Sequence, residues 1–600
     1  MMKSKDKAAG SRFGDGFRHL VKKVSGALQW FYAPVGRNPL LFALVALCSA
    51  ASPLAALVAG ARCMHFLLHA LLGGCLWACL ACRLPKTWLK VTVACLFMCV
   101  ALAEVFHMAL LYKSLDQDSI ALVMNTGVGE ARGFIVEFLS PQIIIALVLA
   151  VAALVLLSFF VGRSRLTLPR WCYRFAFPLF LCVCAGAAGV VKMFSVLTCS
   201  TYEELIVWES VCGDNPDISN GARALKADPV SKSAYLFKAG QLYARNFHLW
   251  SDCQRKIYDA VPRASAPGDS LSVVVVIGES FIRSHSSLYG YHLPVNPGLE
   301  REMRDSALFV FADAVAPANY TVISLSNILN LNALSRSEKW WESVSLPMAF
   351  HKAGWSVEMF SNQYVPRSNQ DLGMELFDTL ALDSIYSAYN SLNFEYDGDF
   401  LASLPLRQGE PEARTLTVIH LMGQHFPPSM RVPPASRHRF VADDIPADKP
   451  WLTHERRVVV AEYADATLYN DSIVSAIIDT YRDKPTLLVY FSDHGEEMWD
   501  SAPAGHRTRQ YPDDHEWVRR MHDVPLVFWM SPSLRRQSPQ LEAALRSAVA
   551  RPVSLDLIAH SLLGAFVPSS PWYRQEFDVL SPAYVFPERI LAHGYYYSER

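Results

Sequence analysis

Long apolar stretches occupy the first third of the chain, and shorter apolar runs occupy the rest. Five stretches are long and apolar enough to cross a bilayer as helices, and they cover residues 39–59, 64–82, 91–111, 143–161 and 175–196. A basic leader, residues 1–38, precedes the first stretch, so a cleaved signal peptide fits poorly. The pattern predicts a transmembrane domain of five helices within residues 39–200.

Basic residues predict how these helices are oriented. Lysine and arginine gather before the first stretch, between the second and third, and between the fourth and fifth. Because basic residues collect on the cytoplasmic side, the N-terminus is expected in the cytoplasm and everything after about residue 200 outside it. Glu104, His107 and Lys192 fall inside the stretches. We expect them near the outer ends, reaching the lipid headgroups, with a functional role as the alternative.

Beyond a polar, partly helical connector at residues 201–268, six short β-rich runs alternate with longer mixed segments. These runs cover residues 271–277, 308–312, 356–360, 416–421, 486–491 and 524–529. Near-continuous apolar strands separated by helical segments are typical of a mostly parallel sheet that is buried on both faces. We therefore predict an α/β domain over residues 269–600, with a central sheet sandwiched by helices.

Composition narrows the function classes. The formal net charge of the 600 residues is −1, and no basic tract stands out beyond the leader, which argues against a nucleic-acid partner. Ten of the 13 cysteines fall at or before Cys184, within or beside the apolar stretches. Cys212 and Cys253 could pair in an oxidising compartment, but the sequence leaves this open.

Polar residues follow several of the predicted strands. Glu279 follows the first and Asn362 the third, the HLMGQH segment with His425 begins at the end of the fourth, and Asp493 and His494 follow the fifth. In an open parallel sheet, ligands gather outside the carboxyl ends of the strands. One such residue alone is commonly a cap or a turn residue, but their joint occurrence predicts a metal site built from distant segments.

Thr321 is the candidate nucleophile. It begins the segment TVISLSNILNLNAL, in which Val322, Leu325 and Ile328 mark one helical face, so its hydroxyl is expected near a helix N-terminus. The N–H groups there favour a phosphate and a developing alkoxide. A threonine needs a base or a bound metal to become a good nucleophile. An ordinary N-cap is the alternative.

Several motifs occur together and in order: IGESFIRSHSSLYGY, PANYT, HLMGQHFPPSMRVP, YADATLYNDSI, and FSDHGEEMWD followed by GHR. With the five apolar stretches, they make the chain resemble the membrane-anchored phosphoethanolamine transferases of the alkaline phosphatase and sulfatase superfamily. The SLYGY and DHGEE forms are most similar to the branch that modifies the lipopolysaccharide core. The resemblance implies an alkaline-phosphatase-like domain in the periplasm, held at the bacterial inner membrane.

Carried over to this sequence, the resemblance implies roles for single residues. Glu279, Thr321, Asp493 and His494 would bind one zinc ion, with Mn or Mg suiting the site less, and Thr321 Oγ would attack.

His425 and His506 would hold the substrate phosphate or a second metal. His515 and His522 could compete with His506, but only His506 has the preceding glycine of the motif. By analogy, Asn362 and the region Gln363 to Gln370 would contact the headgroup. Within that region Arg367 is a candidate phosphate contact, with an ordinary exposed loop arginine as the alternative.

The implied reaction has two steps. Thr321 takes phosphoethanolamine from phosphatidylethanolamine, and an acceptor on lipopolysaccharide, either a core sugar or lipid A, then receives it. Ser280 stands where many relatives have threonine, and Gln424 where many have serine, which puts substrate detail in doubt more than reaction type.

Three alternatives differ in class. A sulfatase would need a cysteine or serine for conversion to formylglycine, and no such motif accompanies Thr321. A glycerolphosphate transferase would share the five-span plan and the threonine but differ in headgroup and acceptor. A membrane sensor or assembly protein could keep the fold without turnover.

Overall fold

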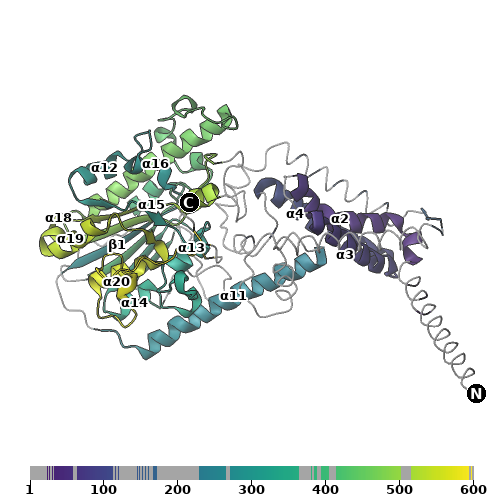
Figure 1. The fold of residues 1–600 in the computed structure, drawn as a ribbon, viewed down its shortest axis with the longest axis horizontal. Coiled ribbons are helices and arrows are strands. Elements are labelled where there is room, and N and C mark those ends of the chain that lie inside the picture. Colours follow the sequence, from purple (N-terminus) through teal and green to yellow (C-terminus); the bar gives the residue numbers. More distant parts are fainter. Residues whose placement is uncertain are drawn as a thin grey trace, which may run out of the picture. The chain divides into compact units, whose positions relative to one another are not determined.

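The computed structural model describes residues 33–58, 64–111, 166–169, 229–264, 270–363, 384–387, 394–403, 414–501 and 515–592, together with isolated positions between and after them. The chain divides into two compact units. The N-terminal unit comprises Met1–Gln117 and Ser140–Ala239, and the C-terminal unit comprises Asp118–Leu139 and Gly240–Arg600 (Figure 1).

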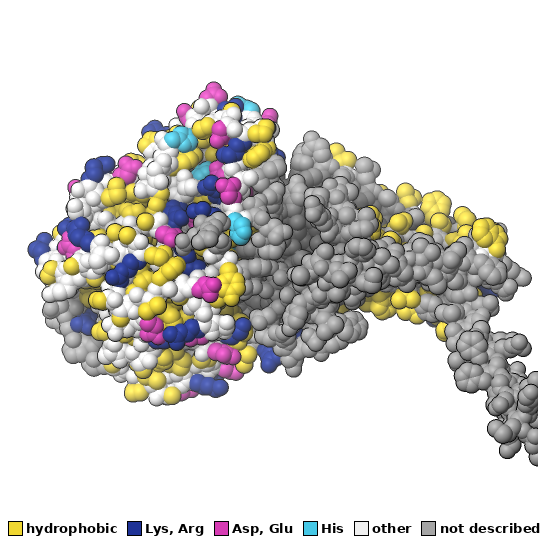
Figure 2. Space-filling model, in the orientation of Figure 1, with side chains coloured by type: hydrophobic (Ala, Val, Ile, Leu, Met, Phe, Trp, Pro, Cys, Tyr) yellow, Lys and Arg dark blue, Asp and Glu magenta, His cyan; other side chains and the backbone are white. Residues whose placement is uncertain are grey.

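Helices form most of the described part of the N-terminal unit. They are η1 (Ala33–Arg37), α2 (Pro39–Val58), α3 (Met64–Arg83), α4 (Thr87–Leu111) and the start of α11 (Pro229–Ala260). Leu41, Val45, Cys79 and Phe97 are among the side chains of their common core. In Figure 2, hydrophobic side chains cover most of the described surface that this unit turns toward the viewer. Leu47, Leu76 and Leu96 are among the exposed side chains of its helices.

The first three predicted apolar stretches are thus helical. Among the described residues one helix, Thr87–His107 within α4, is long and apolar enough to cross a membrane, whereas the apolar parts of α2 and α3, Pro39–Ala55 and Ala70–Arg83, are shorter. The predicted stretches 143–161 and 175–196 lie outside the described residues apart from isolated positions. The number of spans, their orientation and the domain boundaries stay predictions.

Glu104 does not reach outward as expected. Its side chain is 3% exposed and faces the protein interior. Lys232 Nζ at the start of α11 lies 3.0 Å from Glu104 Oε1, and Ser52 Oγ on α2 donates to Glu104 Oε2 at 2.9 Å. A buried carboxylate needs an opposite charge and hydrogen-bond donors, and Lys232 and Ser52 supply them here. Lys192 lies outside the described residues.

The C-terminal unit is built on a seven-stranded sheet with the order β2-β8-β7-β1-β6-β4-β5. The strands are β1 (Leu271–Gly278), β2 (Leu308–Val310), β4 (Ser356–Ser361), β5 (Ser384–Ser387), β6 (Arg414–His420), β7 (Thr486–Ser492) and β8 (Leu526–Met530). Its pairings are parallel except the two made by β8, which are antiparallel. A separate parallel pair joins β3 (Ala314–Val315) to β9 (Val553–Ser554). The mostly parallel sheet is confirmed, and each of the six predicted runs overlaps a strand.

Helices cover both faces of this sheet (Figure 1). On one face, Val273, Val275 and Ile277 of β1 share a core with α13 (Thr321–Ile328), α14 (Leu346–Lys352) and α20 (Ile558–Phe566). On the other face, Val274 and Val276 share a core with α12 (Pro297–Arg304), α15 (Asp397–Ser403) and α16 (His454–Tyr481). Because side chains alternate between the faces of a strand, the unbroken apolar run of β1 serves both cores.

Shorter elements complete this unit. The remaining helices are α17 (His515–His522), α18 (Pro532–Gln537) and α19 (Pro539–Ala548). Short 3₁₀ turns are η3 (Arg283–His285), η4 (Ser287–Tyr289), η5 (Leu334–Arg336), η6 (Trp340–Glu342), η8 (Pro428–Met430), η9 (Pro434–Ser436), η10 (Ala442–Asp444), η11 (Leu555–Leu557) and η12 (Gln575–Phe577). Cys253 on α11 is a free thiol, and Cys212 lies outside the described residues.

The register of the parallel strands brings their carboxyl ends to one edge. Gly278 of β1 pairs with Ser492 of β7, and Ile277 pairs with His420 of β6. On the far side of β6, His420 pairs with Ser361 of β4. The polar segments after β1, β7, β6 and β4 therefore begin next to one another.

Candidate metal centre

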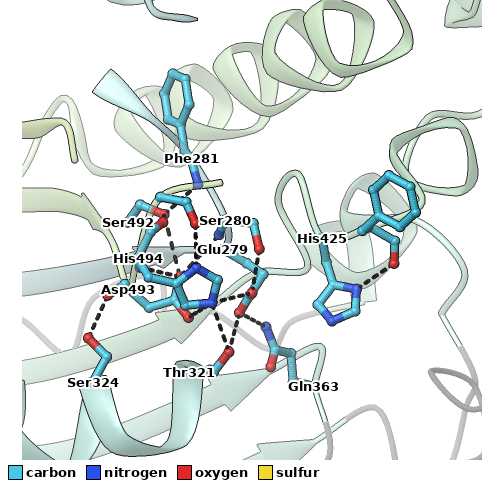
Figure 3. Close-up of polar contacts among 12 residues, drawn as sticks. Glu279, Ser280, Phe281, Thr321, Ser324, Gln363, His425, Ser492, Asp493 and His494 are labelled. Atoms are coloured by element: carbon cyan, nitrogen blue, oxygen red, sulfur yellow. Dashed lines mark hydrogen bonds and ion pairs between the residues drawn. The ribbon is translucent and has the colours of Figure 1, made fainter. Parts of the chain in front are cut away.

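Glu279, Asp493 and His494 form a buried cluster at this edge of the sheet. Glu279 follows β1, and Asp493 and His494 follow β7, so the pairing of Gly278 with Ser492 brings them together. Each is fully buried, and one ligand atom from each lies within 4.8 Å of the others. Figure 3 shows these side chains pointing toward one another.

Thr321 contacts the cluster from the start of α13. Its Oγ1 donates to Glu279 Oε2 at 2.9 Å and lies 3.5 Å from His494 Nε2 (Figure 3). The N-cap position of α13 belongs to Tyr320, so Thr321 is the first residue of the helix and does not act as an ordinary N-cap. Ser324 Oγ, one turn later, donates to the carbonyl of Asp493 at 2.5 Å and ties the helix to the β7 loop.

One backbone carbonyl determines which ring nitrogen of His494 carries the hydrogen. Its Nδ1 lies 2.7 Å from Gly495 O, and because a carbonyl only accepts, Nδ1 carries the hydrogen. Nε2 then faces the carboxylates, 3.2 Å from Glu279 Oε1 and 3.3 Å from Asp493 Oδ2. A neutral imidazole would present a lone pair there, beside two carboxylates. This donor set fits a divalent cation, and mixed oxygen and nitrogen ligation suits zinc without requiring it.

Ser280 holds both carboxylates. Its Oγ donates to Glu279 Oε1 at 2.8 Å, and its N–H donates to Asp493 Oδ1 at 3.1 Å. The residue has a φ of 57°, a conformation that is costly for β-branched side chains. Tyr463 stabilises it by donating its hydroxyl hydrogen to the carbonyl of Ser280 at 2.5 Å. An unbranched serine therefore suits this position better than a β-branched residue would.

Gln363 lies in the region that was expected to contact the headgroup, but its contact with Glu279 was not predicted. Its Nε2 donates to Glu279 Oε2 at 3.0 Å and to Leu421 O at 3.1 Å, so it links the candidate ligand to the loop after β6 (Figure 3). The only signal in the sequence is its place in the polar segment Ser361-Asn362-Gln363 after β4. That signal does not say which of the three side chains turns toward the site.

The other predicted site residues, His425, Asn362, His506 and Arg367, are not part of the three-residue cluster or lie outside the described residues. His425 is set apart from the three-residue cluster in Figure 3, and its Nδ1 donates to Phe426 O at 2.8 Å. Asn362 Nδ2 donates to Asp397 Oδ1 at 2.8 Å. His506 and Arg367 lie outside the described residues. The roles of all four stay predictions.

Other histidines have different surroundings. His522 Nδ1 donates to the carbonyl of Ala316 at 2.8 Å, and His515 is exposed at the start of α17. Burial lowers the pKa of His420 to about 4, against the nearby charge of Glu279, which raises it. His420 is therefore a neutral side chain beside the cluster at neutral pH.

The sequence that carries this site is similar to known proteins. The family described as Sulfatase matches residues 272–567. The phosphoethanolamine transferase EptC of Escherichia coli strain K12 is 28% identical over 276 residues, which are 45% of this chain and 46% of EptC. The phosphoethanolamine transferase CptA of Salmonella typhimurium is 29% identical over 276 residues, which are 45% of this chain and 46% of CptA. The matched part thus spans about half the length of these curated relatives.

A solved structure extends the likeness in fold. The integral membrane protein lipooligosaccharide phosphoethanolamine transferase A (EptA) from Neisseria meningitidis has a TM-score of 0.60 and is 18% identical. The match covers 90% of this chain and 98% of that protein. At this identity the likeness concerns the fold. Residues 272–567 thus form a domain that matches the sulfatase family, and EptC and CptA, two of its relatives in sequence, are phosphoethanolamine transferases.

Proposed function

We propose that this protein transfers phosphoethanolamine from phosphatidylethanolamine to a lipopolysaccharide acceptor, a core sugar or lipid A, through a covalent intermediate on Thr321. One observation carries the proposal: the Thr321 hydroxyl donates to Glu279 Oε2 at 2.9 Å, beside Asp493 and His494. The relatives that are named phosphoethanolamine transferases support the choice of group.

Glu279, Asp493, His494 and Thr321 would together hold one divalent cation, which we propose is zinc. A bound cation there lowers the pKa of the attacking hydroxyl and offsets charge on the phosphoryl oxygens. The Thr321 hydrogen points at Glu279 Oε2, which is placed to receive it. Ser280 and Gln363 keep that carboxylate in place through their hydrogen bonds.

The reaction would proceed in two displacements. Thr321 Oγ attacks the phosphorus, the bond from phosphorus to the diacylglycerol oxygen breaks, and diacylglycerol leaves with a proton. An acceptor oxygen then attacks the phosphorus, loses its own proton, and releases Thr321 Oγ, which regains a proton. His425 and His506 would hold the phosphoryl oxygens during both steps.

The N-terminal unit would serve this reaction as an anchor. Its apolar helices would hold the protein in the bacterial inner membrane, with five spans and a cytoplasmic N-terminus, and the C-terminal unit would face the periplasm. A lipid donor and a lipid-linked acceptor are both available at that surface.

Mass spectrometry of lipopolysaccharide tests the proposed transfer. Cells that express the intact protein should gain a phosphoethanolamine group on lipopolysaccharide, and fragmentation would place it on lipid A or the core. Cells that express Thr321→Ala at the same level should show none. If a glycerolphosphate group were found instead, the donor would be a different phospholipid from the one proposed. If lipopolysaccharide were unchanged although the protein is folded and metal-loaded, the proposal would be contradicted.

A further inference from the structure

Asp397 is a buried carboxylate at the start of α15. Its side chain is 4% exposed and accepts three hydrogen bonds. Oδ1 accepts from Asn362 Nδ2 at 2.8 Å and from Met422 N at 2.9 Å, and Oδ2 accepts from Gly423 N at 2.9 Å. Because buried N–H groups need acceptors, this one carboxylate fixes both the end of β4 and the turn after β6.

The turn that Asp397 holds lies directly against the backbone of Glu279. Leu421 N donates to Ile277 O at 2.9 Å, and Gln424 N donates to Glu279 O at 3.0 Å. Gly423 has a φ of +47°, and a Cβ added there would lie 2.8 Å from Glu279 N. Such close contact leaves no room for a side chain at Gly423, so a displacement of this turn would displace Glu279.

A second connection runs to the Glu279 side chain. Gln363 follows Asn362, which Asp397 binds, and Gln363 Nε2 joins the carbonyl of Leu421 to Glu279 Oε2. Both segments bound by Asp397 therefore meet at Glu279, one at its backbone and the other at its carboxylate.

His425 is at the end of the same turn. The backbone N–H of His425 donates to Met422 O at 3.0 Å. Asp397 in turn accepts from the N–H of Met422, so Asp397 and His425 bind the same residue. Arg431 Nε donates to His425 O at 3.0 Å and holds the other side of the turn.

We propose that Asp397 is a positioning residue, which sets the places of the Glu279 carboxylate and the His425 imidazole relative to Thr321 without touching metal or substrate. This inference rests on the proposed function, because it assigns Asp397 to the same site. It predicts that a change at Asp397 alters metal binding and transfer through the loop after β6.

The test compares Asp397→Asn with Asp399→Asn in the full chain, purified in detergent. Asp399 is exposed two residues along the same helix and undergoes the same chemical change. At Asp397, an amide would turn at least one N–H toward backbone donors, so the turn would have to move. The affinity for zinc alone, measured by competition with a coloured chelator, should fall about 10- to 100-fold in Asp397→Asn, and it should be unchanged in Asp399→Asn.

Transfer at saturating zinc gives a second measurement. In Asp397→Asn we expect the kcat for phosphoethanolamine transfer to fall at least as far as the zinc affinity, with a smaller change in KM for the donor. Equal zinc affinity and equal kcat in the two variants would overturn the inference while the proposed function stands. If the intact protein transfers nothing, the proposed function fails, and the zinc affinities alone decide the role of Asp397.

A milder variant covers the case in which Asp397→Asn does not fold. Asn362→Ala removes only one of the three hydrogen bonds to Asp397 and should lower zinc affinity in the same direction by a smaller factor. The measurement is made without donor, so a headgroup contact by Asn362 cannot produce this change. Unchanged zinc affinity in a folded Asn362→Ala protein would contradict the inference.

Discussion

The geometry of the cluster depends on side chains that are not themselves candidate ligands. Ser280 and Gln363 each donate to a different oxygen of Glu279, and the carbonyl of Gly495 sets the tautomer of His494. Fixed partners of this kind orient ligands and keep them in the correct protonation state. Loss of one partner should therefore weaken metal binding without removing a ligand.

We predict this effect for Gln363→Ala. The substitution leaves Glu279 Oε2 with the Thr321 hydroxyl but removes the amide that ties it to Leu421 O. Zinc affinity should fall about 10- to 100-fold, measured by chelator competition. The exposed Gln540→Ala on α19 is the control and should bind zinc as the intact protein does. Equal affinities would show that Gln363 does not hold Glu279.

Not every residue of the site could be predicted from the sequence. Glu279, Asp493 and His494 were predictable because each lies one or two residues after a strand, and parallel strands end at one edge. Gln363 and Asp397 were not, because their importance depends on loops from distant parts of the chain that meet after folding. The same holds for Glu104, whose partner Lys232 lies far along the sequence.

At the scale of elements, strand positions were predictable, but strand direction was not. Each apolar run produced a strand whose ends lie within a few residues of the prediction, since a buried strand needs an unbroken β-rich stretch. The apolar pattern of a strand carries no information on its direction in the sheet. The antiparallel β8 therefore could not be distinguished from the parallel strands. β5, with the sequence SIYS, carries too short an apolar run to be recognised.

Glu104 on α4 and Lys232 on α11 form a buried ion pair, so the effects of substituting them on stability should depend strongly on each other. Removing one member leaves a buried charge without its opposite charge, so Glu104→Gln or Lys232→Met should each cost about 3–5 kcal/mol of unfolding free energy. The double variant should recover much of this loss because no charge is left buried. Thermal unfolding in detergent measures all four proteins as a double-mutant cycle. Simple additivity of the two losses would contradict a direct interaction.

Asp471 couples α16 to α12 in a way that depends on pH. Its carboxylate accepts from Gly298 N at 2.7 Å and Leu299 N at 3.0 Å, and burial raises its pKa to about 6. Because this folded-state pKa lies above the unfolded value of about 3.9, protonation favours the folded state. The contribution is fully present below about pH 4 and is lost as the pH rises through about 6.

Asp471→Asn should remove this dependence on pH. Relative to the variant, the intact protein should lose up to about 3 kcal/mol of unfolding free energy between pH 4 and 6. Thermal unfolding across that range makes the comparison, with the exposed Asp483→Asn as the control. Parallel curves for the intact protein and Asp471→Asn would contradict the raised pKa.

At the scale of the whole molecule, metal binding should stabilise the C-terminal unit. Glu279 and Asp493 are two buried carboxylates at one place, and a bound cation would offset their repulsion. Zinc at 100 times its dissociation constant should add about 2.7 kcal/mol of stability. A chelator should therefore lower the melting temperature and abolish transfer, and added zinc should restore both.

A ligand-deficient variant is the control for chelation. Asp493→Asn should melt at the same temperature with and without the chelator, because its site no longer binds the cation tightly. If the chelator lowers the melting temperature of both proteins equally, a metal held elsewhere would be responsible.

The covalent intermediate on Thr321 connects the site to the function of the whole protein. The intact protein in detergent is mixed with phosphatidylethanolamine without an acceptor, quenched in acid and digested, and its peptides are examined by mass spectrometry. We predict one phosphoethanolamine group on Thr321, absent from Thr321→Ala and lost when lipopolysaccharide is added before the quench. Modification of another residue, or transfer to lipopolysaccharide by Thr321→Ala, would contradict the account.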